Sequence, residues 1–443
     1  MGTQYTTEAE PGASPLPYTT PMEHTSSATS LAIGSGLSAN VDPVLAAEQI
    51  CEQASSSVES GQIDLAIVFA SGGHAHDLDQ VCTTVSRMIS PATIIAVTAQ
   101  SVSGTNIELE QQTGVSLFAA SLPGTVIQSF TYRDLPHVED ADDLDALEKT
   151  AQALGVGPDL RAVLVVADPF SVPAASMVDS ITNTHRVVDG LERCPVIGGM
   201  ASAATRPGGN MLLINDHAMR HGAVGVTIRG DVNIDTVVSQ GCRPIGTPMV
   251  ITSAQRNIIK SLGGRRAMDV LRDLVTGLDA EDRELLSGGL FVGRVINEYK
   301  SHFGRGDFLI RGVVGVEQKS GAVAVGESVR AGQTVQFHVR DAKTADEDLA
   351  LLVAAQKLQH PPAGGLLFTC NGRGTGLFGE PNHDAEMLCT SLCDDAGQPM
   401  PLAGFAAAGE IGPIGPTSFL HGHTCCCALF RAPRRDGGHQ DFV

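Results

Sequence analysis

The feature that most constrains the fold of this chain is one strand and helix pattern that occurs three times. Each copy opens with an apolar run of strand length, passes through a loop and a helical stretch to a second strand, and ends in a further strand. The copies occupy about residues 65–120, 160–230 and 365–430. Any α/β protein alternates strands and helices, but here a glycine loop follows the second strand in every copy. We therefore interpret the pattern as an internal repeat in an α/β fold of mixed sheets flanked by helices.

The third copy carries the most distinctive residues. An apolar strand at 365–369 leads into the glycine-dense loop 370–376, and Asn382 and Asp384 are placed to cap a following helix. A second strand then runs into another glycine loop, which contains Glu410. Both loops leave the carboxyl ends of their strands, and ligands of parallel sheets usually bind at that edge. We therefore predict a ligand site there.

Composition argues against several classes of partner. The chain has 443 residues with a formal net charge of −20, no Trp and only 4% aromatic residues. Few rings are available to stack on bases, and the charge repels phosphate and anionic lipid, so we expect no nucleic-acid or membrane partner. No apolar run approaches the ~18 residues needed to span a bilayer. The ten cysteines are scattered, which indicates buried thiols in a reducing, cytoplasmic compartment.

The residues outside the repeats differ from them in composition and in secondary-structure pattern. Residues 1–30 are rich in Thr, Ser, Pro and Glu and are predicted to be disordered, and the tail 432–443 is predicted to be flexible. Residues 231–342, between the second and third copies, contain short β-branched runs broken by glycine, together with an amphipathic helix at 266–275. Such runs are typical of antiparallel strands.

The loop 370–379 has two interpretations. It contains a literal G-x-G-x-x-G, but Pro381 delays the helix whose N-terminus a dinucleotide pyrophosphate would need, so we expect no dinucleotide or other cofactor. The glycine amides beside Arg373 could form an anion-binding concavity for a carboxylate or phosphate. The glycines could equally serve only to form a tight turn.

Cys370 suggests a catalytic hypothesis. It ends a predicted strand, and His383 and Asp384 follow it, so a thiolate, an imidazole and a carboxylate could form a nucleophilic site. No recognisable motif supplies an oxyanion hole. We favour a buried or ligand-lining thiol and assign no catalytic residue.

Two histidine pairs resemble metal ligands. They are His74 with His76, and His421 with His423, the second pair lying beside three consecutive cysteines in an apolar run. No C-x-x-C or H-E-x-x-H motif accompanies either pair. We therefore expect chance pairs of surface histidines and no metal site.

Charged residues at the strand ends favour a zwitterionic ligand. Glu410 is a lone acid among apolar and glycine residues, and it could pair with Arg373 or with a ligand ammonium group. Asp168 occupies the corresponding strand end in the second copy, although it could simply shape a turn. If the copies share one cleft, these three residues and Ser202 would line it, and the opposite charges would suit an amino acid.

Motifs along the whole chain resemble, in order, those of the FIST domain, which is named for F-box and intracellular signal-transduction proteins. Each motif is modest, and their order and completeness make the resemblance specific. The matching segments are 66–71, 96–104, 167–170, 196–202, 222–226, 370–373, 378–384, 404–405 and 409–412.

The resemblance covers about residues 31–431 and implies a FIST N domain at 31–235 and a FIST C domain at 236–431. It implies an intracellular sensory module for a small ligand such as an amino acid or another small carboxylate. Related chains carry an F-box or a bacterial signalling domain, whereas we see no such fused domain here, so a separate signalling protein is the expected partner. The expected ligand-binding residues are Cys370, Asn371, Gly372, Arg373, Asp384, Gly404, Glu410, Asp168, Gly199 and Ser202.

Three functions remain open from the sequence. The preferred one is ligand binding for signalling without chemistry. The second is an enzyme that uses Cys370 or Glu410 on a small substrate. The third is a protein–protein scaffold, which would not need polar residues to converge at the strand ends.

Overall fold

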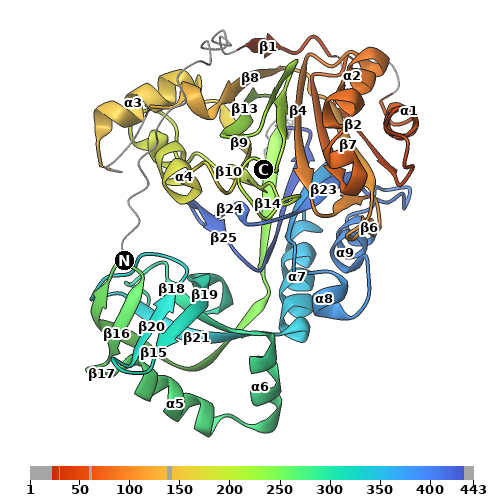
Figure 1. Cartoon of the computed structure of the whole chain (residues 1–443). Coiled ribbons are helices and arrows are strands. Elements are labelled where there is room, and N and C mark those ends of the chain that lie inside the picture. The colour runs from red at the N-terminus through yellow and green to blue at the C-terminus, as the bar shows by residue number, and fades with distance from the viewer. Residues whose placement is uncertain (1–21, 29, 59–61, 137–141, 434–443) are drawn as a thin grey trace, which may run out of the picture.

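The computed structural model describes residues 22–28, 30–58, 62–136 and 142–433. They form a body of three mixed sheets, with helices on the outer faces, and a smaller barrel that projects from the body (Figure 1). The α/β class, with mixed sheets flanked by helices, is therefore confirmed.

The three copies of the repeat fold alike. In each sheet the four strands of a repeat follow the spatial order third, second, fourth, first, and only the pair formed by the second and third strands is parallel. The first repeat contains β2 (Ala32–Ser38), α1 (Pro43–Ser55), β3 (Leu65–Ser71), α2 (Leu78–Ile89), β4 (Thr93–Ala99) and β7 (Gly114–Ser121). The second contains β8 (Thr125–Thr131), α3 (Leu144–Ala153), β9 (Leu160–Ala167), α4 (Ala174–Thr182), β10 (Val196–Met200) and β13 (Ala223–Gly230). The third contains β14 (Asn233–Gln240), α7 (Ala342–Gln356), β22 (Gly364–Cys370), α8 (Thr375–Phe378), α9 (His383–Ser391), β23 (Leu402–Ala407) and β26 (Thr424–Arg431).

The repeats exchange hairpins in a closed cycle. Each repeat inserts a short hairpin before its last strand, and that hairpin extends the sheet of another repeat. The first repeat's hairpin, β5 (Val102–Gly104) with β6 (Ile107–Leu109), pairs with β23 of the third. The second repeat's hairpin, β11 (Leu212–Ile214) with β12 (His217–Met219), pairs with β4 of the first repeat. The third repeat's hairpin, β24 (Glu410–Ile414) with β25 (Thr417–His421), pairs with β10 of the second repeat.

One hydrophobic cluster fills the space between the three sheets. It draws buried residues from all three repeats, and its aromatic centre joins Phe69 to Phe405, whose ring centroids are 5.2 Å apart, and to Phe368 at 6.4 Å. Fully burying each such ring contributes roughly 1.5–3 kcal/mol. The inner faces of the sheets therefore hold the repeats together, and the helices pack against the outer faces.

Residues 242–340 form a closed barrel inserted between β14 and α7. Its strands follow the order β15, β21, β18, β19, β20, β16, and β16 pairs with β15 to close the ring. All of its pairings are antiparallel, as the β-branched runs predicted. Its elements are β15 (Cys242–Gln255), β16 (Ile258–Leu262), β17 (Arg265–Arg266), α5 (Ala267–Gly277), α6 (Ala280–Leu285), β18 (Leu290–Val295), β19 (Phe308–Glu317), β20 (Ala322–Val325) and β21 (Thr334–Arg340).

The predicted bounds of the terminal segments and of the two domains can be compared with the described elements. Within the segment 1–30 that was predicted to be disordered, β1 (Glu23–Thr25) pairs with β8, while residues 1–21 lie outside the described residues. Most of the predicted flexible tail, 434–443, also lies outside them. The expected boundary between residues 235 and 236 falls within β14, the first strand of the third repeat.

The predicted capping of α9 is wrong. Asn382 occupies the N-cap position with a φ of 70°, and its side-chain oxygen accepts a hydrogen bond from the Glu108 amide at 2.8 Å. Asp384 binds Arg373. Both side chains therefore bind partners outside their own helix.

Candidate functional site

The strand register places the three repeats in correspondence. In each parallel ladder the last residue of the second strand lies opposite the last residue of the third. These pairs are Ser71 with Ala99, Ala167 with Met200, and Cys370 with Ala407. They define equivalent sheet edges, so each repeat can be compared with the other two.

At two positions that match among the repeats, the third repeat alone in the described chain carries a guanidinium and a carboxylate. The strand ladders allow two positions to be matched among the three repeats. One position lies three residues after the second strand of a repeat. The other lies beside the start of the hairpin that the repeat exchanges. The matched pairs are His74 and Ser101, Phe170 and Met211, and Arg373 and Glu410. Since the other two repeats have no guanidinium or carboxylate at these matched positions, the fold does not itself require Arg373 and Glu410 there.

The inserted barrel adds a second guanidinium to this edge. In the first repeat three residues, 39–41, separate β2 from Asp42, whose carboxylate caps α1. In the third repeat the barrel occupies the equivalent place, and Asp341 caps α7. Arg340, the last barrel residue, therefore reaches the strand end: a Cβ atom on Gly372 would lie 2.7 Å from Arg340 Nη1.

Arg340 is a candidate site residue that sequence reasoning missed. Its Nε and Nη2 atoms are buried and have no hydrogen-bond partner among the described residues. A buried donor without a partner is unfavourable by roughly 1–3 kcal/mol, so these atoms are suited to an acceptor supplied from outside the chain. No local pattern marks Arg340, because it ends an ordinary strand far along the chain from the loop that it contacts.

Arg373 forms a buried ion pair with Asp384. The two hydrogen bonds, from Nε to Oδ2 and from Nη2 to Oδ1, are 2.6 and 2.8 Å long, and the two residues are only 4% and 1% exposed. Burial opposes ionisation of Asp384, but Arg373 and His383 outweigh it and hold the carboxyl pKa at about 2. Asp384 thus already balances the charge of Arg373. The Nη1 atom of Arg373 is buried and has no hydrogen-bond partner in the described chain.

Glu410 offers one free carboxylate oxygen. Its Oε2 atom accepts hydrogen bonds from the Thr424 amide at 3.0 Å and hydroxyl at 2.7 Å, while Oε1 is buried without a partner. Burial raises the pKa of Glu410 to about 7, against the opposing effects of Thr424, Arg373 and Arg340. The Glu410 carboxylate also raises the pKa of the Cys370 thiol.

Cys370 lies within this charged group but is not activated. Burial and the Glu410 carboxylate raise the pKa of the thiol to about 11, although Arg340 and amide hydrogen bonds oppose the rise. His423, whose Nδ1 has no partner, has a pKa lowered to about 4 by burial and by Arg340. We call Arg340, Cys370, Arg373, Glu410 and His423 the junction cluster.

The hypothesis that Cys370, His383 and Asp384 form a nucleophilic site is not supported. His383 Nδ1 contacts Asp384 at 3.0 Å and Nε2 contacts Asp346 at 3.1 Å, so neither ring nitrogen is available to the thiol. The ring also stacks on Phe378 with centroids 3.4 Å apart. The contacts of His383 with the two carboxylates and with Phe378 hold the loop before α9 in place.

Other expected ligand-binding residues bind the protein itself. Asp168 accepts hydrogen bonds from Asn210, the Phe170 amide and Ser171, so it shapes the turn after β9. Ser202 joins all three repeats, because its hydroxyl accepts from the Gln100 amide at 2.9 Å and donates to the Ala406 carbonyl.

The remaining expected residues are backbone positions. Gly404 and Gly199 lie where strands pack closely, since an added Cβ would lie 2.1 Å from the Leu367 carbonyl oxygen in one case and 2.9 Å from Ala407 Cβ in the other. The Asn371 amide donates to the Ala407 carbonyl at 3.0 Å, and Gly372 lies against Arg340. The structure thus brings Cys370, Gly372, Arg373 and Glu410 together but links neither Asp168 nor Ser202 to them by a hydrogen bond.

The two histidine pairs are not surface histidines throughout. His74 and His421 are buried, and each contacts a backbone carbonyl oxygen, that of Asn40 at 2.6 Å and that of Gly412 at 2.8 Å. No group of three or more metal-ligating side chains occurs in the described part of the chain. His74 and His421 therefore serve packing.

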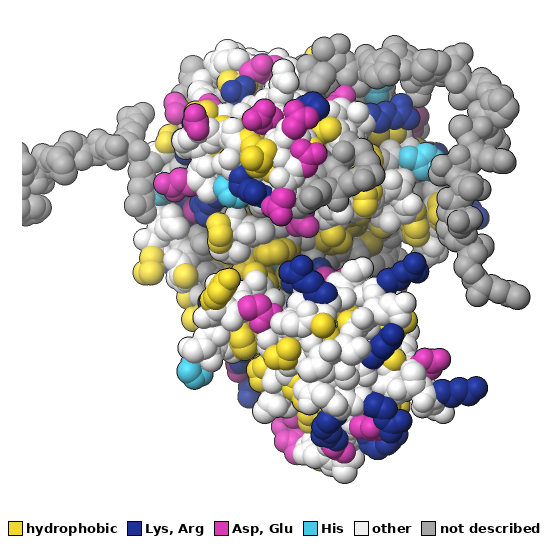
Figure 2. Space-filling view, turned by 90° about the vertical axis from the view of Figure 1, so that its left-hand side faces the viewer, with side chains coloured by type: hydrophobic (Ala, Val, Ile, Leu, Met, Phe, Trp, Pro, Cys, Tyr) yellow, Lys and Arg dark blue, Asp and Glu magenta, His cyan; other side chains and the backbone are white. Residues whose placement is uncertain are grey.

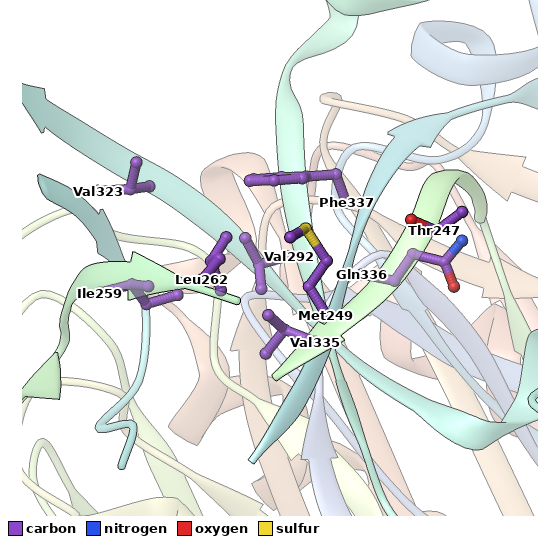
Figure 3. Close-up of a pocket in the computed structure, with 9 residues that line it drawn as sticks. All are labelled: Thr247, Met249, Ile259, Leu262, Val292, Val323, Val335, Gln336 and Phe337. Atoms are coloured by element: carbon purple, nitrogen blue, oxygen red, sulfur yellow. The ribbon is translucent and has the colours of Figure 1, made fainter. Parts of the chain in front are cut away.

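Two cavities of the described chain lie away from the junction cluster. Apolar side chains from β15, β16, β18, β20 and β21 point into the barrel and leave a space of only about 10 Å³, room for one water molecule at most (Figure 3). A groove of about 520 Å³ runs between α1 and the segment before β23, but its one carboxylate, Asp394, already accepts two backbone amides. Neither space gathers unpartnered charged groups as the junction cluster does.

Comparison with known proteins assigns the family. Residues 64–265 match the FIST N domain and residues 267–413 match the FIST C domain. Proteins from two strains of Mycobacterium tuberculosis, each named "Uncharacterized protein", are 38% identical over 407 residues, which is 90% of this chain and 99% of theirs. A protein of Mycobacterium bovis with the same description is 36% identical, over 90% of this chain and 98% of its own. In the described residues, no helix has the length and apolar character to cross a membrane. These matches, together with the repeated fold, show that the chain belongs to the FIST family.

Proposed function

We propose that this protein is a cytoplasmic sensory module that binds a small carboxylate, such as an amino acid, at the junction cluster without transforming it. The observation that carries the proposal is the set of buried, unpartnered polar atoms there. They comprise Nε and Nη2 of Arg340, Nη1 of Arg373, Oε1 of Glu410 and Nδ1 of His423.

The charges of the cluster favour a carboxylate. Asp384 neutralises Arg373, whereas Arg340 has no carboxylate partner within hydrogen-bond distance in the described chain. Guanidinium groups bind carboxylates through short, charge-assisted hydrogen bonds. A carboxylate between Arg340 and Arg373 Nη1 would give these donors acceptors, and Glu410 Oε1 could accept from an ammonium or hydroxyl group of the same molecule. An α-amino acid or a 2-hydroxy acid combines both groups.

The state of Cys370 supports binding in preference to covalent chemistry. A thiol whose pKa is raised to about 11 carries little thiolate at neutral pH, and the thiolate is the nucleophile. His383 is bound to two carboxylates, so this histidine is not available to the thiol as a general base. The thiol instead lines the proposed site as a small, polarizable side chain. All ten cysteines are free, which fits a reducing compartment.

A thermal-shift screen of amino acids and small organic acids tests the proposal. A ligand that binds only the folded state stabilises it by ~2.7 kcal/mol at a hundredfold excess over its dissociation constant. We expect an α-amino or 2-hydroxy acid to raise the unfolding temperature of the wild type, and Arg340→Gln to abolish the shift. Arg330→Gln, at an exposed barrel arginine, is the matched control and should retain it.

The outcomes separate the possible functions. A shift lost in Arg340→Gln and kept in Arg330→Gln supports the binding site. A shift that persists in Arg340→Gln would place the ligand elsewhere, and consumption of the compound would indicate an enzyme. If no small acid stabilises the wild type, the small-ligand proposal fails and a protein partner becomes the better explanation.

A further inference from the structure

The barrel and the body have separate hydrophobic cores. Two clusters of buried apolar side chains belong to the barrel and draw only on residues 242–339. The other four clusters belong to the body. Within the described residues no buried cluster spans both parts. Figure 2 shows the barrel projecting from the body below a narrower waist. Phe291 of the barrel packs against His423 of the body with ring centroids 4.4 Å apart, but the two parts share no buried apolar cluster in the described residues.

The chain crosses between the two parts at two adjacent points. It enters the barrel at Gly241 and leaves it at Asp341, and both crossings are visible in Figure 1 between β14 and β15 and between β21 and α7. The Asp341 amide donates to the Gly241 carbonyl at 3.3 Å, and the Gly241 amide donates to the His423 carbonyl at 2.9 Å. We call these two adjacent crossings the hinge.

Few polar contacts join the parts away from the hinge. Gln240 Nε2 donates to the Phe308 carbonyl at 2.7 Å, and Arg311 Nη2 donates to the Leu420 carbonyl at 2.9 Å. Arg305 and Glu347 form an exposed ion pair at 3.2 Å, which contributes little. No strand of the body pairs with the barrel sheet among the described elements. Small, polar interfaces between domains permit relative motion.

The junction cluster is divided between the two parts. Arg340 belongs to the barrel, one residue before the outgoing crossing, while Arg373 and Glu410 belong to the body. A carboxylate held by both guanidinium groups would bridge the parts at the hinge. We propose that the bound carboxylate clamps the barrel to the body, so that occupancy of the site sets the freedom of the barrel. This inference rests on the proposed function and adds how binding becomes a signal.

The coupling follows from differential binding. A ligand shifts a conformational equilibrium only by as much as its affinity differs between the two states. A carboxylate that needs both arginines binds the closed arrangement fully and an open one weakly. At a free carboxylate concentration about ten times its dissociation constant, opening of the hinge should therefore become about tenfold rarer.

Hydrogen exchange of the full-length protein measures that opening. The informative amides are those of Gly241 and Asp341, which are hydrogen-bonded at the hinge. Exchange is followed with and without two probes, a mixture of the protein amino acids and a mixture of small 2-hydroxy acids. We expect about tenfold slower exchange at the hinge with the effective mixture, and no change at amides in the interior of the barrel strands.

Two variants make the experiment specific. Arg340→Gln removes the barrel's contribution to the bridge and should abolish the protection that the effective mixture gives at the hinge. Arg305→Gln removes a cross-interface ion pair outside the site and should keep the protection. Loss of protection in both variants would mean that general contact between the parts, and not the bridge, slows exchange.

Failure of the clamp differs from failure of the binding site. If a mixture raises the unfolding temperature through Arg340 but hinge exchange is unchanged, the clamp is refuted and the binding site stands. If neither mixture produces stabilisation or protection, both proposals are refuted. Protection accompanied by stabilisation, both lost in Arg340→Gln, supports both.

Discussion

At the scale of single residues, the third repeat shows how one sheet edge acquires charge. Arg373 and Asp384 bind one another at 2.6 and 2.8 Å in a site that excludes water, and Phe378 lies 5.2 Å from the guanidinium. Removing one member of a buried pair leaves the other charge uncompensated. The pair therefore fixes the loop that holds Cys370 and Gly372, and its role is to position the site.

The first residue-scale prediction concerns this pair. Asp384→Asn should lower the free energy of unfolding by about 3–5 kcal/mol, because Arg373 would remain charged and buried. Asp346→Asn is the control; it removes the half-exposed partner of His383 and should change stability by less than ~1 kcal/mol. Urea unfolding measures both. Equal effects of the two substitutions would contradict a dominant role for the buried pair.

The same pair sets a pH dependence in acid. The folded-state pKa of Asp384, about 2, lies below its usual value of 3.8, so the pair's contribution is complete above the usual value and is lost as pH falls towards 2. Urea unfolding at a series of acidic pH values measures this loss of stability. Asp384→Asn should not show the part of the loss that comes from protonation of Asp384.

Glu410 gives the opposite pH dependence. Its folded-state pKa, about 7, lies above its usual value of 4.5, so the folded state holds the proton more tightly than the unfolded state. This contribution to stability is complete below pH 4.5 and is lost as pH rises through about 7. Glu410→Gln should therefore be more stable than the wild type above that pH, by up to about 3 kcal/mol at ~1.4 kcal/mol per unit of pKa shift. Thermal unfolding across this pH range checks it, with exposed Glu386→Gln as the control; identical profiles for wild type and Glu410→Gln would refute it.

At the scale of elements, the exchanged hairpins make the three repeats one body. Each sheet is completed by strands from a neighbouring repeat, so the removal of one repeat would expose edges in the other two. Ser202 lies where the loops of all three repeats meet, and it bonds to Gln100 of the first and Ala406 of the third. The sequence predicted this serine as a ligand contact, and its hydrogen bonds give it a structural role.

The element-scale prediction separates these two roles. Ser202→Ala should lower stability by about 1–3 kcal/mol, because the Gln100 amide loses its acceptor in a largely buried place. It should leave the affinity for a bound carboxylate unchanged, since no hydrogen bond links Ser202 to the junction cluster. Chemical unfolding and ligand titration measure the two quantities, with exposed Ser328→Ala as the control. A large loss of affinity with normal stability would restore Ser202 to the binding site.

At the scale of the whole molecule, the chain is a threefold body with one inserted barrel. The body is closed by the cyclic exchange of hairpins around a shared core, and the barrel is closed by the pairing of β15 with β16. Each part has its own buried apolar clusters, so each has the means to unfold separately.

The whole-molecule prediction is therefore two unfolding transitions in calorimetry. Val292→Asp, which places a charge in the barrel interior, should lower or remove one transition and leave the other in place. Phe405→Ala, in the shared core of the body, should act on the other, by roughly 3–5 kcal/mol. A single transition that moves equally in both variants would show that the parts unfold together.

How much the sequence determined can be judged from particular residues. Apolar runs and glycine loops predicted the repeated strands, the helices, the antiparallel strands of the inserted region and the position of Arg373 and Glu410 at a sheet edge, because hydrophobic periodicity is a local property. Only the tertiary structure decided which strand ends meet. It pairs Arg373 with Asp384, brings Arg340 against Gly372, and turns His383 away from Cys370. These contacts depend on hairpins exchanged between repeats and on a barrel that returns the chain after about a hundred residues, and no local spacing encodes such long-range closure.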